Sequence, residues 1–321
     1  MYSWGPDDVK TWKKQKGYDY GSAEAPYLKK LKKEADEKGP RSYLSKSKPN
    51  LDLVNPLGKK ISTDSSNPII WAVDGTGSMQ TWPKEIHDRT PLVYQTLSKY
   101  KPDFELSLSV IGDAVSDDWA LQVCDFGKGP KLDDYINALY PEGRGGPGIR
   151  ESYELFAYFM NKYVSTPNAE NPFMIIMGDE MFYDKINSKQ IKHYIGDGLQ
   201  EDLNSIEIWQ QLSQKFDIYL LRKEYPGHNE KIVEQWNQAI GPQKIIPIYD
   251  PLRVVDVAMG LIAKRWGNYT DFGKNLISRQ DENSIASVES SLRLAPGFED
   301  LGNKSLSKEK GSKKSKDLME G

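Results

Sequence analysis

The chain of 321 residues is poor in the side chains that usually form covalent cross-links or hold soft metals. It has one cysteine, Cys124, and three histidines that lie far apart in the sequence, His87, His193 and His228. A single cysteine excludes an intramolecular disulfide, and so few soft ligands argue against a zinc site built from cysteine and histidine. We expect Cys124 to pack in a strand and His193 to lie on the surface.

Long apolar runs are also missing. No stretch of the sequence is long enough and apolar enough to span a bilayer. The first eight residues lack the apolar segment that a secretory signal requires. We therefore expect a soluble, cytoplasmic protein that has no membrane partner.

Charge is distributed unevenly along the chain. Residues 1–66 carry 14 Lys/Arg against 9 Asp/Glu, and residues 301–321 carry 6 against 3. The chain as a whole has 43 Lys/Arg and 46 Asp/Glu, which leaves 23 against 34 in residues 67–300. An acidic middle suits cation binding and argues against a nucleic-acid-binding face there, because phosphates require the opposite field.

The most informative stretch is an apolar run that leads directly into oxygen-bearing side chains. Ile69–Val73 is too short for a helix and does not alternate, so it predicts a central parallel strand that is buried on both faces. Asp74, Thr76 and Ser78 follow, separated by single glycines that allow a tight turn. These three side chains are therefore expected to lie together at the C-terminal end of the strand.

A helix is expected immediately after this cluster. Its markers are a proline suited to a first turn and four residues at helical spacing (Pro83, Ile86, Thr90, Val93 and Leu97). In open α/β sheets, ligands bind at such strand-to-helix junctions. One carboxylate and two hydroxyls are hard oxygen ligands that suit Mg²⁺ or Mn²⁺, and the hydroxyls add no negative charge. An ion held this way would still attract another anionic oxygen.

A second apolar segment ends in the same manner. Residues 172–178 form a continuous apolar run, and Asp179 follows it. Because the carboxyl ends of parallel strands meet at one edge of a sheet, Asp74 and Asp179 should converge there. The sequence thus predicts that Asp179 lies beside the cluster of Asp74, Thr76 and Ser78, which suits magnesium or manganese.

These motifs resemble the metal-ion-dependent adhesion site (MIDAS) of von Willebrand factor A (VWA) domains, whose first motif is Asp-x-Ser-x-Ser. Here the motif reads Asp74-Gly-Thr76-Gly-Ser78, and Asp179 matches the aspartate at the end of the third motif's strand. The resemblance implies a Rossmann-like α/β fold, with a mostly parallel sheet, one antiparallel edge strand and helices on both faces. It also implies metal-dependent protein binding, in which the ion takes an Asp or Glu of the partner.

The loop before the third helix departs from that family pattern. VWA domains usually supply a threonine from this loop, whereas residues 143–149 contain neither Thr nor Ser. Glu151 and Ser152 lie one turn further on and could reach the ion directly or through water, or could cap the following helix. We place Glu151, Ser152 and Asp113 around the four ligands. Arg144 and Arg150 are expected to face solvent and to attract an acidic partner.

Specific strings between residues 111 and 155 sharpen the resemblance. The segments Ile111–Ala114 and Glu142–Gly148 resemble a subgroup of intracellular microbial VWA proteins. That resemblance implies assembly with larger machines, often AAA+ ATPases.

The remaining pattern predicts one α/β domain over residues 67–267. A basic extension, 1–66, with two short helices precedes it, and a polar extension, 268–321, ending in a disordered basic tail follows. Residues 104–110 alternate and predict a half-exposed strand, and 121–126 predict a short strand paired with it in a hairpin. The segment 183–203 is expected to be an irregular insertion near the metal edge.

Two other functions remain open at this stage. A metal-dependent phosphatase or hydrolase could use Asp74, although haloacid-dehalogenase enzymes need a second aspartate two residues away, and the chain has Ala72 and Thr76 there. RNA binding through the basic extensions is the other alternative. A dinucleotide fold is disfavoured because Gln80 stands where its motif requires glycine. Simple helix capping by Asp74 would need no ligand at all.

Overall fold

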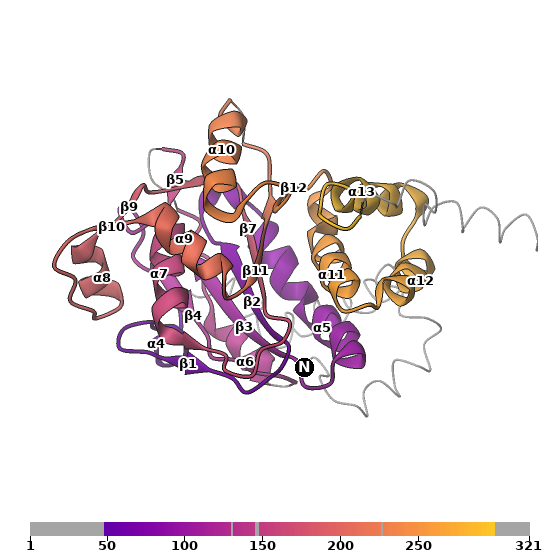
Figure 1. The fold of residues 1–321 in the computed structure, drawn as a ribbon, viewed down its shortest axis with the longest axis horizontal. Helices are drawn as coiled ribbons and strands as arrows, with labels where there is room; N and C mark the ends of the chain where they lie inside the picture. The colour runs from indigo at the N-terminus through magenta and orange to yellow at the C-terminus, as the bar shows by residue number, and fades with distance from the viewer. Residues whose placement is uncertain (1–47, 130, 145–147, 226, 299–321) are drawn as a thin grey trace, which may run out of the picture.

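The computed structural model describes residues 48–129, 131–144, 148–225 and 227–298 (Figure 1). The two helices expected in the basic extension and the tail after residue 298 lie outside these residues. The labels follow Figure 1, and the strands are β1 Ile61–Ser62, β2 Pro68–Asp74, β3 Glu105–Ile111, β4 Leu121–Val123, β5 Arg150–Glu151, β6 Val164–Ser165, β7 Phe173–Gly178, β8 Met181–Phe182, β9 Lys185–Ile186, β10 Leu203–Asn204, β11 Asp217–Arg222 and β12 Ile245–Pro247.

Helices follow most strands of the main sheet. They are α4 Leu51–Val54, α5 Trp82–Tyr100, α6 Lys131–Ala138, α7 Tyr153–Tyr163, α8 Ser188–Tyr194, α9 Ser205–Ser213, α10 Asn229–Ile240, α11 Val254–Arg265, α12 Tyr269–Arg279 and α13 Glu282–Leu292, with short 3₁₀ turns η1 Gly77–Met79 and η2 Pro251–Arg253. None of the helices in the described ranges is long and apolar enough to cross a membrane.

The centre of the fold is a six-stranded sheet with the order β12-β11-β7-β2-β3-β4. All neighbouring strands are parallel except β3 and β4, which pair in an antiparallel manner. This confirms the expected α/β fold with a mostly parallel sheet and an antiparallel edge strand. The strands alternate with helices along the chain, as parallel pairing requires.

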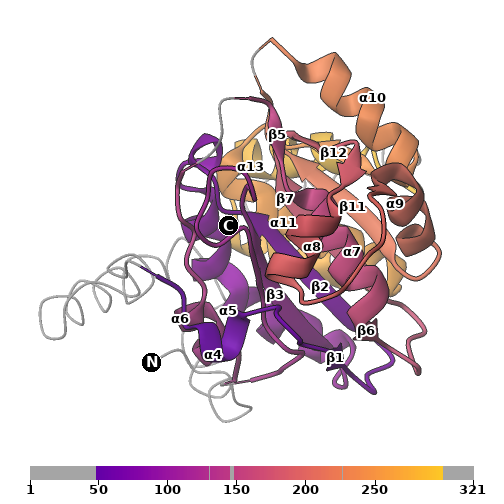
Figure 2. The same ribbon diagram turned by 90° about the vertical axis from the view of Figure 1, so that its left-hand side faces the viewer.

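Helices cover both faces of the sheet (Figures 1 and 2). An apolar core lies between the helices and the sheet on each face. The core on one face includes side chains of α5, α6, α11, α12 and α13. The core on the other face includes side chains of α7, α8, α9 and α10. The residues of β2 alternate between them, since Ile69, Trp71 and Val73 belong to the first core and Ile70 and Ala72 to the second. Every residue of β2 is buried, which explains its unbroken apolar run.

The sequence-based expectation for residues 104–110 was wrong. Residues 106–111 of β3 are all buried, although the alternating serines indicated a half-exposed strand. Ser107 tolerates burial because its hydroxyl donates a hydrogen bond to the Cys124 carbonyl at 2.9 Å. Cys124 is buried, but it lies directly after β4 and not within a strand as expected.

The polar segment after residue 267 also differs from the expected extension in its described part. Residues 269–279 and 282–292 form α12 and α13, and Phe272, Leu276 and Leu292 belong to the core on the α5 side. Only one stripe of each helix is apolar, so the average polarity of the segment does not indicate that α12 and α13 pack on the core. The described fold therefore continues to Phe298, which is 2% exposed.

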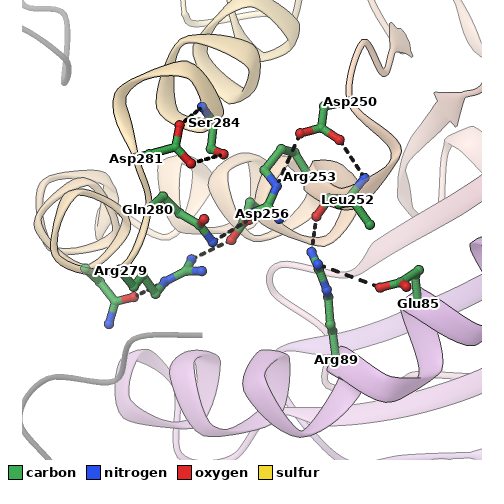
Figure 3. A network of polar contacts seen from close by, with 11 residues as sticks. Glu85, Arg89, Asp250, Leu252, Arg253, Asp256, Arg279, Gln280, Asp281 and Ser284 are labelled. Carbon is green, nitrogen blue, oxygen red and sulfur yellow. Dashed lines mark hydrogen bonds and ion pairs between the residues drawn. The ribbon is translucent and has the colours of Figure 1, made fainter. Parts of the chain in front are cut away.

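A buried network of charges joins these helices to the rest of the domain (Figure 3). Asp256 of α11 is 1% exposed and accepts from Arg279 of α12 at 2.5 Å and from Arg253 at 3.3 Å. Arg89 of α5 donates to the Leu252 carbonyl in η2 and lies 3.7 Å from Glu85. The network thus ties α5, η2, α11 and α12 together, with Asp256 between two arginines.

Replacing Asp256 is predicted to destabilise the fold strongly. Asp256→Asn would leave the buried Arg279 without a carboxylate among the described residues, and Arg253 with only Asp250, 3.6 Å away. Removing one partner of a buried ion pair typically costs about 3 to 5 kcal/mol. Urea unfolding measures the loss in the free energy of unfolding. Asp118→Asn is the control, because Asp118 forms an exposed pair with Arg144 at 3.4 Å and its loss should change stability by less than about 1 kcal/mol. Equal effects of the two substitutions would contradict this account of the network.

Candidate metal centre

The loop after β2 is held by backbone hydrogen bonds to two neighbouring segments. Gly75 N donates to the Ile111 carbonyl at 2.8 Å, and Gly143 N donates to the Gly75 carbonyl at 2.9 Å. A Cβ on Gly75 would lie 2.5 Å from Val110 Cγ1, so only glycine fits there. The loop is therefore clamped between the end of β3 and the loop that begins at residue 141.

The end of this loop carries backbone strain. Gln80 follows η1 and has φ 52° and ψ −114°, a conformation that side chains other than glycine rarely adopt. Such strain costs on the order of 1 to 3 kcal/mol and is concentrated at functional sites. Helix α5 begins at Trp82 with Thr81 as its N-cap residue, so Asp74 does not cap it.

Three hydrogen-bonding contacts connect the four predicted ligands in one chain. Thr76 Oγ1 donates to Asp74 Oδ1 at 2.6 Å, and Ser78 Oγ donates to Asp179 Oδ1 at 2.9 Å. The two hydroxyl oxygens lie 3.2 Å apart. Asp74, Thr76 and Asp179 are nearly fully buried, with 0%, 2% and 2% exposure, and Ser78 is half-buried. The structure thus brings the predicted set together from the ends of β2 and β7.

The positions of the hydroxyl protons decide what this chain can hold. If Thr76 and Ser78 donate their protons to the two aspartates, their oxygens face each other with lone pairs only. That contact is repulsive unless a cation lies near both oxygens or a protonated carboxyl group supplies another proton. Adjacent oxygen ligands of an octahedral Mg²⁺ at about 2.1 Å are about 3.0 Å apart. The observed separation of 3.2 Å is close to that distance, so the donor set fits a small hard cation.

Tyr153 is a component of the site that the sequence analysis did not find. It begins α7, is 0% exposed, and its hydroxyl donates to Asp74 Oδ2. A Cβ on Gly178 would overlap that hydroxyl, so the glycine at the end of β7 makes room for the phenol. Both oxygens of Asp74 thereby accept hydrogen bonds. The only sequence signal was a tyrosine one residue after Ser152, which has no characteristic spacing to Asp74.

Burial and mutual repulsion raise the pKa values of the carboxyl groups around the site. Burial, with the nearby charge of Asp179, raises the pKa of Asp74 to about 7. Burial raises the pKa of Asp179, partly offset by the hydrogen bond from Ser78 and the charge of Lys223. Burial and the charge of Asp179 raise the pKa of Glu180 to about 8. Several carboxylates are thus crowded at one sheet edge, where a bound cation would relieve their repulsion.

Glu151 lies beside this cluster and has a free oxygen. It is 2% exposed, and burial together with the charge of Asp74 raises its pKa to about 11. Its Oε2 atom has no hydrogen-bond partner among the described residues. Glu151 is therefore close enough to the ligand set to feel the charge of Asp74, although no side-chain hydrogen bond joins the two among the described residues.

Ser152 and Asp113 belong to a neighbouring polar cluster. Ser152 Oγ accepts from Ala114 N at 2.8 Å and lies 3.5 Å from Asp113 Oδ1. Asp113 also accepts from the hydroxyls of Ser116 at 2.9 Å and Tyr183 at 3.1 Å. Ser152 makes no side-chain capping bond to α7. These two residues thus support the loop after β3, and none of these hydrogen bonds reaches the four ligands.

The two arginines expected to attract a partner are already paired with carboxylates. Arg144 lies 3.2 Å from Glu142 and 3.4 Å from Asp118, and Arg150 lies 3.5 Å from Asp184. The Arg144 carbonyl also accepts from Gly77 N, which places this loop against the predicted ligands. Their charges are partly neutralised, which weakens the reason for assigning them to partner binding.

Within the described ranges, no three His, Cys, Asp or Glu side chains are arranged to hold a metal ion among themselves. The predicted centre has only two carboxylate ligands, so its capacity for a metal depends on the hydroxyls of Thr76 and Ser78.

No protein-family model matches this sequence, and no curated protein sequence matches it. The structure is similar to the pilus adhesin SpaC from Lactobacillus rhamnosus GG in its open conformation, with 12% identity, a TM-score of 0.46, and coverage of 67% of this chain and 31% of that chain. Another crystal form of SpaC has 14% identity and a TM-score of 0.44, with coverage of 65% of this chain and 32% of that chain. Proximal thread matrix protein 1 from the mussel byssus has 9% identity and a TM-score of 0.42, with coverage of 64% of this chain and 49% of that chain. The chain thus spans about a third of SpaC.

The raised pKa of Asp74 predicts how the stability of the metal-free protein depends on pH. Burial raises the pKa of Asp74 from its ordinary value of 3.8 to about 7, so folding takes up a proton between about pH 4 and pH 7. Stability should therefore fall as pH rises from about 4 to 7, and Asp74→Asn should make that fall smaller. Thermal unfolding in the presence of a chelator between pH 4 and 8 measures this fall in stability. In a domain of this size, about 1 kcal/mol corresponds to a few degrees in the thermal midpoint. Asp118→Asn should keep the wild-type slope, and an unchanged slope in Asp74→Asn would contradict the assignment.

Tyr153→Phe is predicted to weaken Mg²⁺ binding without unfolding the protein. The substitution removes the hydrogen bond that orients Asp74, and losing such an outer contact typically lowers metal affinity about 10- to 100-fold. The ring would keep its packing against Trp236, whose centroid is 5.4 Å away. Calorimetric titration measures the affinity. Tyr100→Phe is the matched control, since it removes a 2.9 Å tyrosine–aspartate bond at the far end of α5. Equal affinities for all three proteins would show that Tyr153 does not position Asp74.

Proposed function

We propose that this protein is a metal-dependent protein-binding module, in which Asp74, Thr76, Ser78 and Asp179 hold Mg²⁺ or Mn²⁺ at an adhesion-type site. The observation that carries the proposal is the hydrogen-bonded chain of these four side chains, with two hydroxyl oxygens 3.2 Å apart. The sequence motifs of the VWA family support the same assignment, because the four residues match its ligand positions.

The four predicted ligands would have different roles at such a site. Asp74 is held by Tyr153 and Thr76, so its charge is fixed in position before any ion arrives. Ser78 and Thr76 offer neutral oxygens, which keep the total charge of the ligand set at −2. A bound Mg²⁺ would supply a Lewis-acidic position for one further anionic oxygen. A carboxylate from an exposed Asp or Glu of a partner protein suits that position.

The surrounding segments determine which partner can approach. The segment 183–203, expected to be irregular, forms β9, α8 and the start of β10, with Ile191 and Ile195 buried and His193 exposed. Ordered insertions near a binding edge commonly set partner choice. The resemblance to intracellular VWA proteins makes the AAA+ ATPases and similar large assemblies the first partners to test.

A hydrolase that uses Asp74 as its nucleophile fits the site less well. Both oxygens of Asp74 accept hydrogen bonds and the side chain is 0% exposed, so it is poorly placed to attack a substrate. RNA binding through the basic ends would depend on residues 1–66 and 301–321, of which residues 1–47 and 301–321 lie outside the described residues. It would appear as salt-sensitive association that is lost when both ends are removed.

Calorimetric titration of Mg²⁺ and Mn²⁺ into the purified protein tests the proposal. The wild type should bind one ion saturably, and acetate should strengthen the binding because it supplies the additional anionic oxygen. Asp179→Ala should reduce the affinity below detection, since it removes one of only two carboxylate ligands, whereas Asp118→Asn should bind as the wild type does. Absence of binding in the wild type would refute the metal mechanism. Turnover of a phosphate ester that is lost in Asp74→Asn would favour the hydrolase.

A further inference from the structure

Two cations at the end of β11 lie beside the acidic cluster. Arg222 is the last residue of β11 and Lys223 follows it. Strand β11 is hydrogen-bonded to β7, and Lys223 N donates to the Gly178 carbonyl at 3.0 Å, one residue before Asp179. This edge of the site is therefore basic, whereas the edge near Glu151 and Glu180 is acidic.

Neither cation has a carboxylate partner among the described residues. Arg222 is 5% exposed, donates to Asn229 Oδ1 at 2.6 Å, and leaves its Nε atom without a hydrogen-bond partner. Lys223 is half-buried, and its ammonium donates to the Ser78 carbonyl. Arg144 and Arg150, by contrast, are paired with Glu142 and Asp184. Lys223 is thus an ammonium group at the edge of the predicted centre that acts on Asp179 through its charge but forms no salt bridge among the described residues.

A fixed positive charge beside a cation site has two opposite effects. It repels an incoming metal ion and so lowers the affinity for that ion. It attracts an anion that binds next to the metal, and the effect is largest where water is partly excluded. An ammonium group that only stabilised the loop would not produce this pair of effects, because loosening the loop weakens both kinds of binding.

We propose that Lys223 is the second contact of the partner's carboxylate, which reaches the metal through one oxygen and accepts a hydrogen bond from Lys223 Nζ through the other. The ammonium has three N–H donors, so its hydrogen bond to the Ser78 carbonyl leaves donors for the carboxylate. A hydrogen bond between an ammonium and a carboxylate is stronger than one between neutral groups. The inference rests on the proposed metal-dependent function. It narrows the ligand to a carboxylate, because a neutral hydroxyl or amide oxygen gains little from the lysine.

The test compares four proteins, each titrated with Mg²⁺ by calorimetry and then melted while saturated with Mg²⁺. Lys223→Met removes the charge and keeps the length of the side chain, and Lys223→Arg keeps the charge. Lys101→Met is the matched control, since Lys101 is also half-buried but follows the far end of α5. The probes are acetate and its neutral isostere acetamide at equal concentration, with NaCl to keep the ionic strength constant.

Lys223→Met should bind Mg²⁺ about three- to tenfold more tightly than the wild type, as expected when one nearby like charge is removed. The same variant should lose most of the rise in thermal midpoint that acetate produces in the Mg²⁺-loaded wild type. Lys223→Arg and Lys101→Met should keep both properties, and acetamide should have little effect on any of the four proteins. In Lys223→Met, the affinity for Mg²⁺ should therefore rise, whereas the affinity for acetate should fall.

Other outcomes would overturn the inference in distinguishable ways. Weaker Mg²⁺ binding in Lys223→Met would show that Lys223 only fixes the Ser78 loop. An unchanged acetate effect in that variant would show that the carboxylate does not contact the lysine. If the wild type binds Mg²⁺ but does not respond to acetate, the metal site stands and the carboxylate ligand does not. If the wild type binds no Mg²⁺, the proposed function fails, and the role of Lys223 fails with it.

Discussion

The parallel pairing of β2 with β7 is the constraint on which the candidate site depends. In the register of this pair, Val73 lies opposite Met177, so the two strands end at the same edge. Asp74 is the last residue of β2, and Asp179 follows directly on β7. The two strands lie at the centre of the sheet, with their flanking strands and both apolar cores holding the register. A shift by one residue would turn either aspartate towards the opposite face.

Burying two aspartates at that edge is unfavourable, and the neighbouring groups reduce the cost in different ways. Tyr153 and Thr76 donate hydrogen bonds to Asp74, and Ser78 donates to Asp179. Lys223 offsets part of the effect of burial on Asp179. These contacts do not neutralise the cluster, because the pKa of Asp74 remains raised to about 7. The remaining imbalance is what makes the site responsive to a cation or to a proton.

The sequence predicted the parts of this arrangement that depend on local pattern. Uninterrupted apolar runs identify β2 and β7 because strands buried on both faces require them. The carboxylate and hydroxyls that follow β2 are close in sequence, so their proximity in space follows from one tight turn. The serines of β3 wrongly predicted a half-exposed strand. Ser107 is buried because its hydroxyl donates to the Cys124 carbonyl, and no local sequence pattern specifies that acceptor. Helices α12 and α13 were missed for a related reason, since their narrow apolar stripes have meaning only against the core they cover.

Tyr153 and Lys223 could not have been assigned from the sequence, and the reason is geometric. Tyr153 reaches Asp74 because Gly178, on a third segment, leaves room for its hydroxyl. Lys223 reaches the Ser78 carbonyl because β11 is hydrogen-bonded to β7 and ends beside Asp179. Each contact joins segments that are far apart in the chain and meet only after the sheet has formed. The ligand atoms of this site are therefore set by one local motif and one strand end, whereas its charge balance is set by tertiary neighbours. A motif of the same residues in another fold would have the same ligands, but a different affinity for cations and anions.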